Sequence, residues 1–86
     1  MPELIAEMAK DLTEPENSTV REFFVAPSAR VTINSRQTRL IYYEDQHSDL
    51  MGKVAILENE GFVTDVTTGT IPIYRMTEDF VAYLKG

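Results

Sequence analysis

The sequence predicts a small α+β domain, and three observations lead to this prediction. Apolar residues recur at helical spacing near the N-terminus and again after residue 48. Between residues 62 and 76, two β-rich runs flank a glycine-containing loop, a pattern typical of a β-hairpin. The 86 residues include no cysteine, and their hydrophobic content of 43% is that of an ordinary globular chain. We therefore expect a single domain over residues 1–86, without disulfides or thiolate metal sites.

The first expected element is an amphipathic helix over residues 3–12. Its apolar positions are Leu4, Ile5, Met8 and Leu12, and Pro2 suits the first turn because its missing N–H is not needed there. This helix either packs on its own domain or forms part of a dimer interface. A loop containing Pro15 should follow it.

Two strand patterns come next, over residues 20–25 and 30–33. The segment 36–43 is compatible with two structures, a buried strand end or a short helix, because periodicity does not separate them. Its aromatic residues and those of the first strand are expected in the core, and the alternative is that they stack on single-stranded bases. These residues are Phe23, Phe24, Tyr42 and Tyr43.

A second helix is expected over residues 48–60, with Ser48 or Asp49 as its N-cap. Gly61 should end it in the left-handed conformation, with Phe62 returning onto Leu57 as in a Schellman motif. Gly52 is unusual inside a helix and suggests close approach by another backbone. The methionines at positions 8, 51 and 76 are interpreted as core packing.

The β-hairpin expected over residues 62–76 precedes a C-terminal helix over residues 78–85. Pro72 cannot donate to a strand ladder, so its strand is expected at an edge of the sheet. Thr77 is expected to cap the last helix, with Glu78 and Asp79 at the positive end of the helix dipole.

Charge is distributed unevenly along the chain. The formal net charge is −6, from 8 basic and 14 acidic side chains. Residues 23–43 contain three arginines and no acid, whereas residues 1–22 and 44–86 are both net acidic. The stretch from Arg30 to Arg39 is therefore the one region expected to attract an anionic partner at close range.

Residues 48–84 resemble the winged helix-turn-helix family. A capped helix runs into the 57–63 sequence Leu-Glu-Asn-Glu-Gly-Phe-Val, a hairpin follows, and Tyr74-Arg75-Met76-Thr77 leads into the terminal helix. The resemblance implies a winged-helix-like fold, in which helix 48–60 is the recognition helix and the hairpin is the wing. The family places another helix directly before the recognition helix, where this sequence has segment 35–43 and a polar linker.

This resemblance implies a small DNA-binding transcriptional regulator that binds double-stranded DNA, with a homodimer as the expected assembly. Helix 48–60 would then lie in the major groove, while the arginine segment would contact the DNA backbone. The candidate contacts are basic, amide and hydroxyl side chains, namely Arg30, Asn34, Arg36, Gln37, Arg39, Ser48 and Lys53. Lys53 is the only basic residue of the helix, and the loop at the hairpin tip is uncharged.

A second hypothesis belongs to a different class. The acidic balance also favours a protein-interaction module, an adaptor or an inhibitor that presents carboxylates to a basic, nucleic-acid-binding partner.

Enzymatic activity is not expected. The acidic residues Glu44, Asp45 and Asp49 surround His47, and they are interpreted as an exposed linker with a solvated histidine. The alternative for these residues is a magnesium or manganese site. We expect no catalytic residue, metal or cofactor. The sequence contains no apolar run long enough for a membrane span and no signal-peptide pattern, so a cytoplasmic location is expected.

Overall fold

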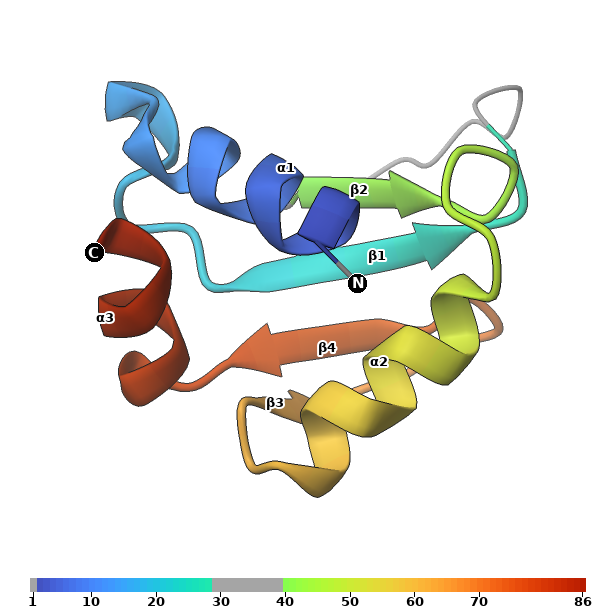
Figure 1. Ribbon diagram of the computed structural model, residues 1–86. Helices are drawn as coiled ribbons and strands as arrows, with labels where there is room; N and C mark the ends of the chain where they lie inside the picture. The colour runs from blue at the N-terminus through green and yellow to red at the C-terminus, as the bar shows by residue number, and fades with distance from the viewer. Residues whose placement is uncertain (1, 29–39) are drawn as a thin grey trace.

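The computed structural model describes residues 2–28 and 40–86, and it confirms the expected α+β class (Figure 1). In chain order the elements are α1 (Pro2–Thr13), the 3-10 helix η1 (Pro15–Asn17), β1 (Glu22–Ala26), β2 (Leu40–Tyr43), α2 (Leu50–Asn59), β3 (Val63–Asp65), β4 (Ile73–Met76) and α3 (Glu78–Lys85). The helices and the hairpin therefore form where the sequence predicts them, with ends that differ by one or two residues.

The four strands form one mixed sheet in the order β2-β1-β4-β3. Strand β1 runs parallel to β2 and antiparallel to β4, and β3 pairs with β4 as the expected hairpin. The prediction that Pro72 marks an edge strand is wrong, because β4 lies between β1 and β3. Pro72 precedes the first residue of β4, so no ladder N–H is lost, and its carbonyl accepts from the Val25 N–H at 3.0 Å.

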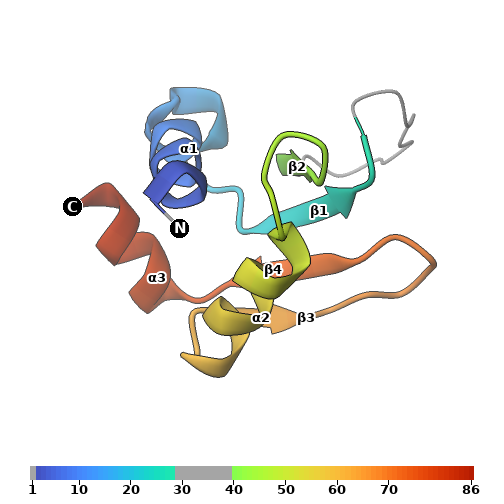
Figure 2. The same ribbon diagram turned by 45° about the vertical axis from the view of Figure 1, so that its right-hand side comes forward.

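All three helices lie on the same side of the sheet (Figures 1 and 2). Alternation along the strands directs one set of side chains toward them, and the register places Phe23 opposite Tyr74 on this side. Within the described residues, the core between helices and sheet consists of the buried residues Leu4, Met8, Leu12, Phe23, Val25, Tyr42, Leu50, Val54, Leu57, Val63, Tyr74, Met76, Phe80, Val81 and Leu84. The apolar residues of α1 are buried in this core. The helix therefore packs on its own domain, and no row of apolar side chains on α1 remains exposed to form a dimer interface.

Residues 40–43, which are compatible with strand or helix in the sequence, form the strand β2. Val25 pairs with Tyr42 in the parallel ladder, and the ring of Tyr42 is 1% exposed against the edge of Phe23. Turns over residues 44–49 then lead directly into α2. Within the described residues no helix precedes α2 in the place where a helix-turn-helix has one. The strand expected over residues 30–33 lies outside the described residues.

Both helix ends predicted around the hairpin are confirmed. At the end of α2, the Phe62 N–H donates to the Leu57 carbonyl at 2.9 Å and the Gly61 N–H donates to the Glu58 carbonyl at 3.0 Å, with Gly61 at φ +80°. These two bonds are those of a Schellman motif. At the start of α3, the Thr77 hydroxyl accepts from the Phe80 N–H at 3.3 Å.

Candidate functional site

The residues predicted to contact DNA are divided between two regions. Arg30, Asn34, Arg36, Gln37 and Arg39 lie outside the described residues. Ser48 is exposed in the turn before α2, and Lys53 is half-buried in the second turn of that helix. Ser48 and Lys53 therefore lie near the same end of α2.

Helix α2 has a buried row and an exposed apolar face. Leu50, Val54 and Leu57 point into the core, as their spacing predicts. On the other side of the helix, the side chain of Ile56 is 52% exposed, while Met51, at the margin of the buried row, is 37% exposed. We call the residues of the side opposite the buried row the outer face of α2; they are Gly52, Ala55, Ile56 and Asn59. The interpretation of Met51 as core packing is wrong, whereas Met8 and Met76 are buried as expected.

The start of α2 explains the glycine inside the helix. Asp49 occupies the N-cap position in the left-handed conformation, at φ 52°, and its side chain does not cap the helix by a hydrogen bond. Its carboxylate instead occupies the space into which a Cβ at position 52 would project. The close neighbour of Gly52 is thus a side chain, and the expectation of a second backbone is wrong. A carboxylate at this end of the helix is favoured by the helix dipole.

The turn that carries the acidic residues is attached to α1. His47 is 7% exposed, and its Nε2 lies 2.5 Å from a carboxylate oxygen of Glu7. Next to this contact, the Tyr42 hydroxyl donates to Asp11 at 3.0 Å. Sequence reasoning expected a solvated histidine, and that expectation is wrong because α1 covers the ring. Burial raises the pKa of Asp11, and burial together with the Asp11 charge raises the pKa of Tyr42, so the phenol keeps its proton.

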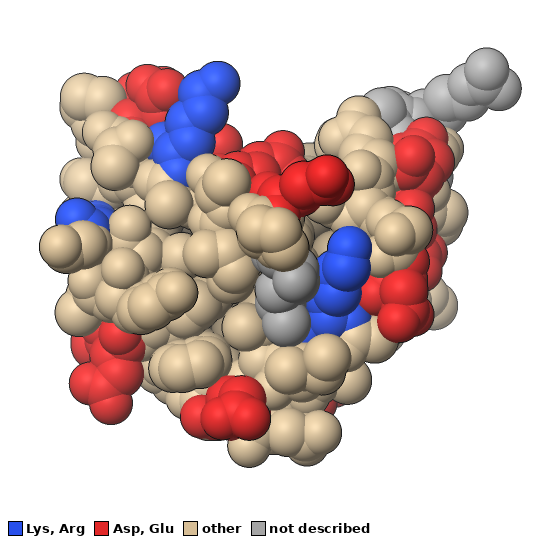
Figure 3. All heavy atoms as spheres, viewed as in Figure 1, with Lys and Arg blue, Asp and Glu red and all other residues tan. Residues whose placement is uncertain are grey.

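These two contacts bring two sets of carboxylates together. Glu3, Glu7 and Asp11 follow one another at four-residue spacing along the side of α1 that faces the turn. The turn itself exposes Glu44, Asp45 and Asp49. We call these six residues the acidic surface. In Figure 3 acidic atoms lie over α1 near the top centre and along the right-hand margin, where the turn lies.

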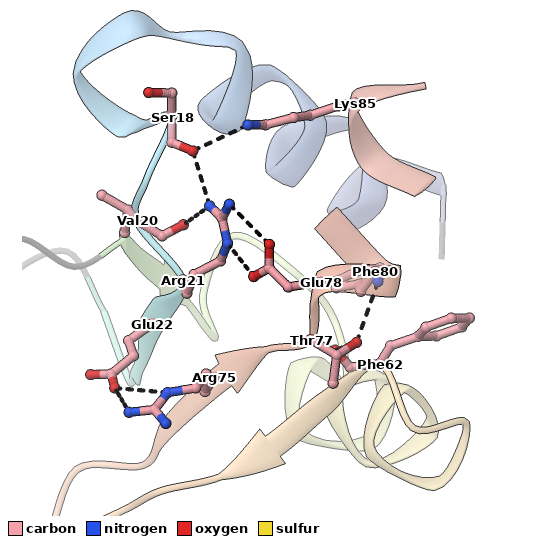
Figure 4. A network of polar contacts seen from close by, with 10 residues as sticks. All are labelled: Ser18, Val20, Arg21, Glu22, Phe62, Arg75, Thr77, Glu78, Phe80 and Lys85. Carbon is pink, nitrogen blue, oxygen red and sulfur yellow. Dashed lines mark hydrogen bonds and ion pairs between the residues drawn. The ribbon is translucent and has the colours of Figure 1, made fainter. Parts of the chain in front are cut away.

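Figure 4 shows the partners of three basic residues: Arg21, which precedes β1, Arg75 of β4 and Lys85 of α3. Arg21 binds Glu78 at 2.8 Å and also donates to the carbonyls of Ser18 and Val20, which joins β1 to α3. Two similar contacts lie nearby, Arg75 with Glu22 at 2.7 Å and Lys85 with the Ser18 carbonyl at 3.1 Å. The hydrogen bond from Arg21 lowers the pKa of Glu78.

The consequence is an asymmetric charge distribution. Within residues 2–28 and 40–86, Glu44, Asp45 and Asp49 take part in no ion pair, while Arg21 and Arg75 are paired with Glu78 and Glu22. Lys53 is the single basic residue in the sequence between Arg39 and Arg75. Any phosphate that approached Ser48 and Lys53 would therefore also meet the carboxylates of the turn.

The described part of the chain contains no group of three His, Cys, Asp or Glu side chains placed to hold a metal ion. None of its helices is long and apolar enough to cross a membrane. A comparison of the chain with family models, curated proteins and solved structures found no match.

Sequence reasoning missed the outer face of α2 and the acidic surface. A helical wheel would have revealed the first, because Ile56 falls far from the row of Leu50, Val54 and Leu57. No local signal reveals the second, because it depends on the contact between His47 and Glu7, which are 40 residues apart.

Proposed function

We propose that this protein is an acidic protein-interaction module that presents its acidic surface to a basic protein partner. The observation that carries the proposal is the separation of charge. Within the described residues, Arg21 and Arg75 are paired with Glu78 and Glu22, while Glu44, Asp45 and Asp49 of the turn are exposed and take part in no ion pair. Such a surface attracts a basic partner and repels nucleic acid.

The attachment of the turn gives this surface a defined shape. The Glu7–His47 contact and the Tyr42–Asp11 hydrogen bond hold the turn on α1, so the exposed carboxylates are ordered before a partner arrives. Preorganisation reduces the entropy that binding would otherwise cost. A basic, nucleic-acid-binding protein has the complementary charge, and masking its basic side chains would make this module an inhibitor or an adaptor.

An amide-resolved titration with an arginine-rich peptide tests the proposal. We expect shifts at residues 44–49 and along α1, with an affinity that falls as salt is added. The double variant Glu44→Gln/Asp45→Asn should weaken binding roughly three- to tenfold, because charges at the rim of an interface act mainly by raising the association rate.

The matched control is Glu14→Gln/Glu16→Gln, which removes the same charge from two exposed acids that follow the C-terminal end of α1. This control should bind the peptide as the parent does. Equal loss of affinity in both double variants would show that net charge alone acts, and would refute a defined acidic surface.

A winged-helix DNA-binding regulator is the second candidate function. The order of α2, the β3–β4 hairpin and the capped helix α3 supports it, because the resemblance over residues 48–84 implies the same order. Titration with mixed-sequence duplex DNA at low salt separates the candidates. Shifts at Lys53 and in the hairpin that disappear with added salt would support DNA binding and count against the acidic module.

A further inference from the structure

The outer face of α2 carries an exposed apolar residue that the proposed acidic module does not use. Most amphipathic helices are polar on the side away from the core. Here Ile56 is half-exposed at the centre of the helix, and the exposed Ala55 next to it is too small to keep a second helix away.

We infer that this face binds the same face of a second copy, with the two α2 helices antiparallel and a two-fold axis at Ile56. In such an interface each residue meets the residue equally far from the axis on the partner. Gly52 then lies opposite position 60, and position 53 lies opposite position 59.

The charges on α2 fit this arrangement. Lys53 and Glu60 are seven residues, or about two helical turns, apart. Seen along the helix axis, both therefore lie on the same flank of the outer face, beside Ile56. A two-fold axis perpendicular to two antiparallel helices places the same flank of each helix next to that of its partner. Lys53 therefore meets the partner's Glu60, and Glu60 meets the partner's Lys53. At the start of α2, the Asp49 carboxylate above Gly52 reaches the amide of the partner's Asn59 as a hydrogen-bond acceptor.

A parallel pair related by a two-fold axis has no such complementarity, because it would turn the side with Lys53 and Glu60 toward the partner's opposite side, which carries Gly52 and Asn59. The antiparallel pair brings these opposite charges together, and the parallel pair does not. A ten-residue helix is about 15 Å long, and a contact of this length lies at the small end of protein interfaces. We therefore expect a weak dimer that forms between micromolar and millimolar concentration.

Sedimentation velocity over this concentration range is the first test. The wild-type chain should pass from monomer to dimer, and Ile56→Glu should lower the association constant by at least about tenfold, because it places two carboxylates at the axis. Ile56 is exposed, so the fold should survive, which circular dichroism would verify. Ala6→Glu, which adds the same charge to an exposed position of α1, is the matched control and should dimerise like the wild type.

Charge reversal tests the orientation. Lys53→Glu and Glu60→Lys should each weaken the dimer, and the double variant Lys53→Glu/Glu60→Lys should restore it. Because the chain has no cysteine, Ile56→Cys should also form an intermolecular disulfide under mild oxidation far faster than Ala6→Cys.

A wild-type chain that stays monomeric at millimolar concentration would overturn the inference, as would a dimer unaffected by Ile56→Glu. Failure of the double charge reversal to restore the dimer would overturn the antiparallel arrangement. None of these measurements involves a basic ligand or DNA, so the inference and the proposed function can fail separately.

Discussion

The carboxyl group of Asp11 reduces the stability of the fold at neutral pH. Burial raises its pKa above the ordinary 3.8, even though the Tyr42 hydroxyl donates to it. A group with a higher pKa in the folded chain binds its proton more tightly when folded. Its stabilising contribution is therefore complete below pH 3.8 and is lost as the pH rises through the folded-state pKa.

Asp11→Asn should accordingly raise the free energy of unfolding at neutral pH, because the amide carries no charge and still offers an oxygen to Tyr42. The gain should shrink as the pH falls and should vanish well below 3.8, where Asp11 is protonated in both states. Urea unfolding at several pH values measures this. Glu14→Gln, at an exposed position, should change little, and an Asp11→Asn protein less stable at neutral pH would contradict the expectation.

His47 shows why single residues are the hardest scale to predict. Its neighbours in the sequence are Gln46 and Ser48, both exposed, so local composition indicates a solvated side chain. The residue that covers it is Glu7, 40 positions away. Burial of a polar residue in a loop depends on which distant element lies over it, and no local pattern contains this information.

At the scale of elements, the end of α2 provides a direct test of backbone conformation. Gly61 has φ +80° and no atom within 4 Å of the place where a Cβ would be added. Gly61→Ala should therefore destabilise the protein by about 1 kcal/mol, because alanine is unfavourable in the left-handed conformation even where no other atom clashes with its Cβ. Thermal or urea unfolding provides the measurement.

Gly69 is the matched control, because it also has open space around its Cα but no positive φ. Gly69→Ala should be neutral or slightly stabilising, by a few tenths of a kcal/mol. If both variants lost the same stability, the Schellman motif would not be the reason that glycine is needed at position 61.

Structural features that depend on residues close together in the sequence could be predicted. The helix ends at Gly61 and Thr77 follow from capping chemistry within a few residues, and the buried row of α2 follows from its spacing. The edge-strand prediction from Pro72 failed because the missing N–H of a proline matters only inside a strand, and β4 begins one residue after Pro72. The strand at residues 40–43 could not be assigned from the sequence because it depends on pairing with the parallel strand β1, which lies 14 or more residues earlier; residues 36–39 lie outside the described residues.

For the whole molecule, the sheet order predicts which backbone hydrogen bonds open least often. Strands β1 and β4 lie at the centre, and their amides are bonded across the molecule, for example Val25 to Pro72 and Met76 to Arg21. We expect the amides of Val25 and Met76 to exchange only by global unfolding, whereas the loop amides at Thr68 and Gly69 exchange fast. Native-state hydrogen exchange measures this. Faster exchange at Val25 than at Thr64 of the edge strand β3 would contradict it.

The central position of β4 also determines when the protein can fold during its synthesis. Arg21 and Val25 bond to residues about fifty positions later, so a nascent chain that has left the ribosome only as far as α2 has no β4 to pair with β1. Until Met76 emerges, the aromatic side chains of β1 stay uncovered along that edge. We therefore expect unfinished chains of this protein to bind chaperones that recognise exposed apolar segments.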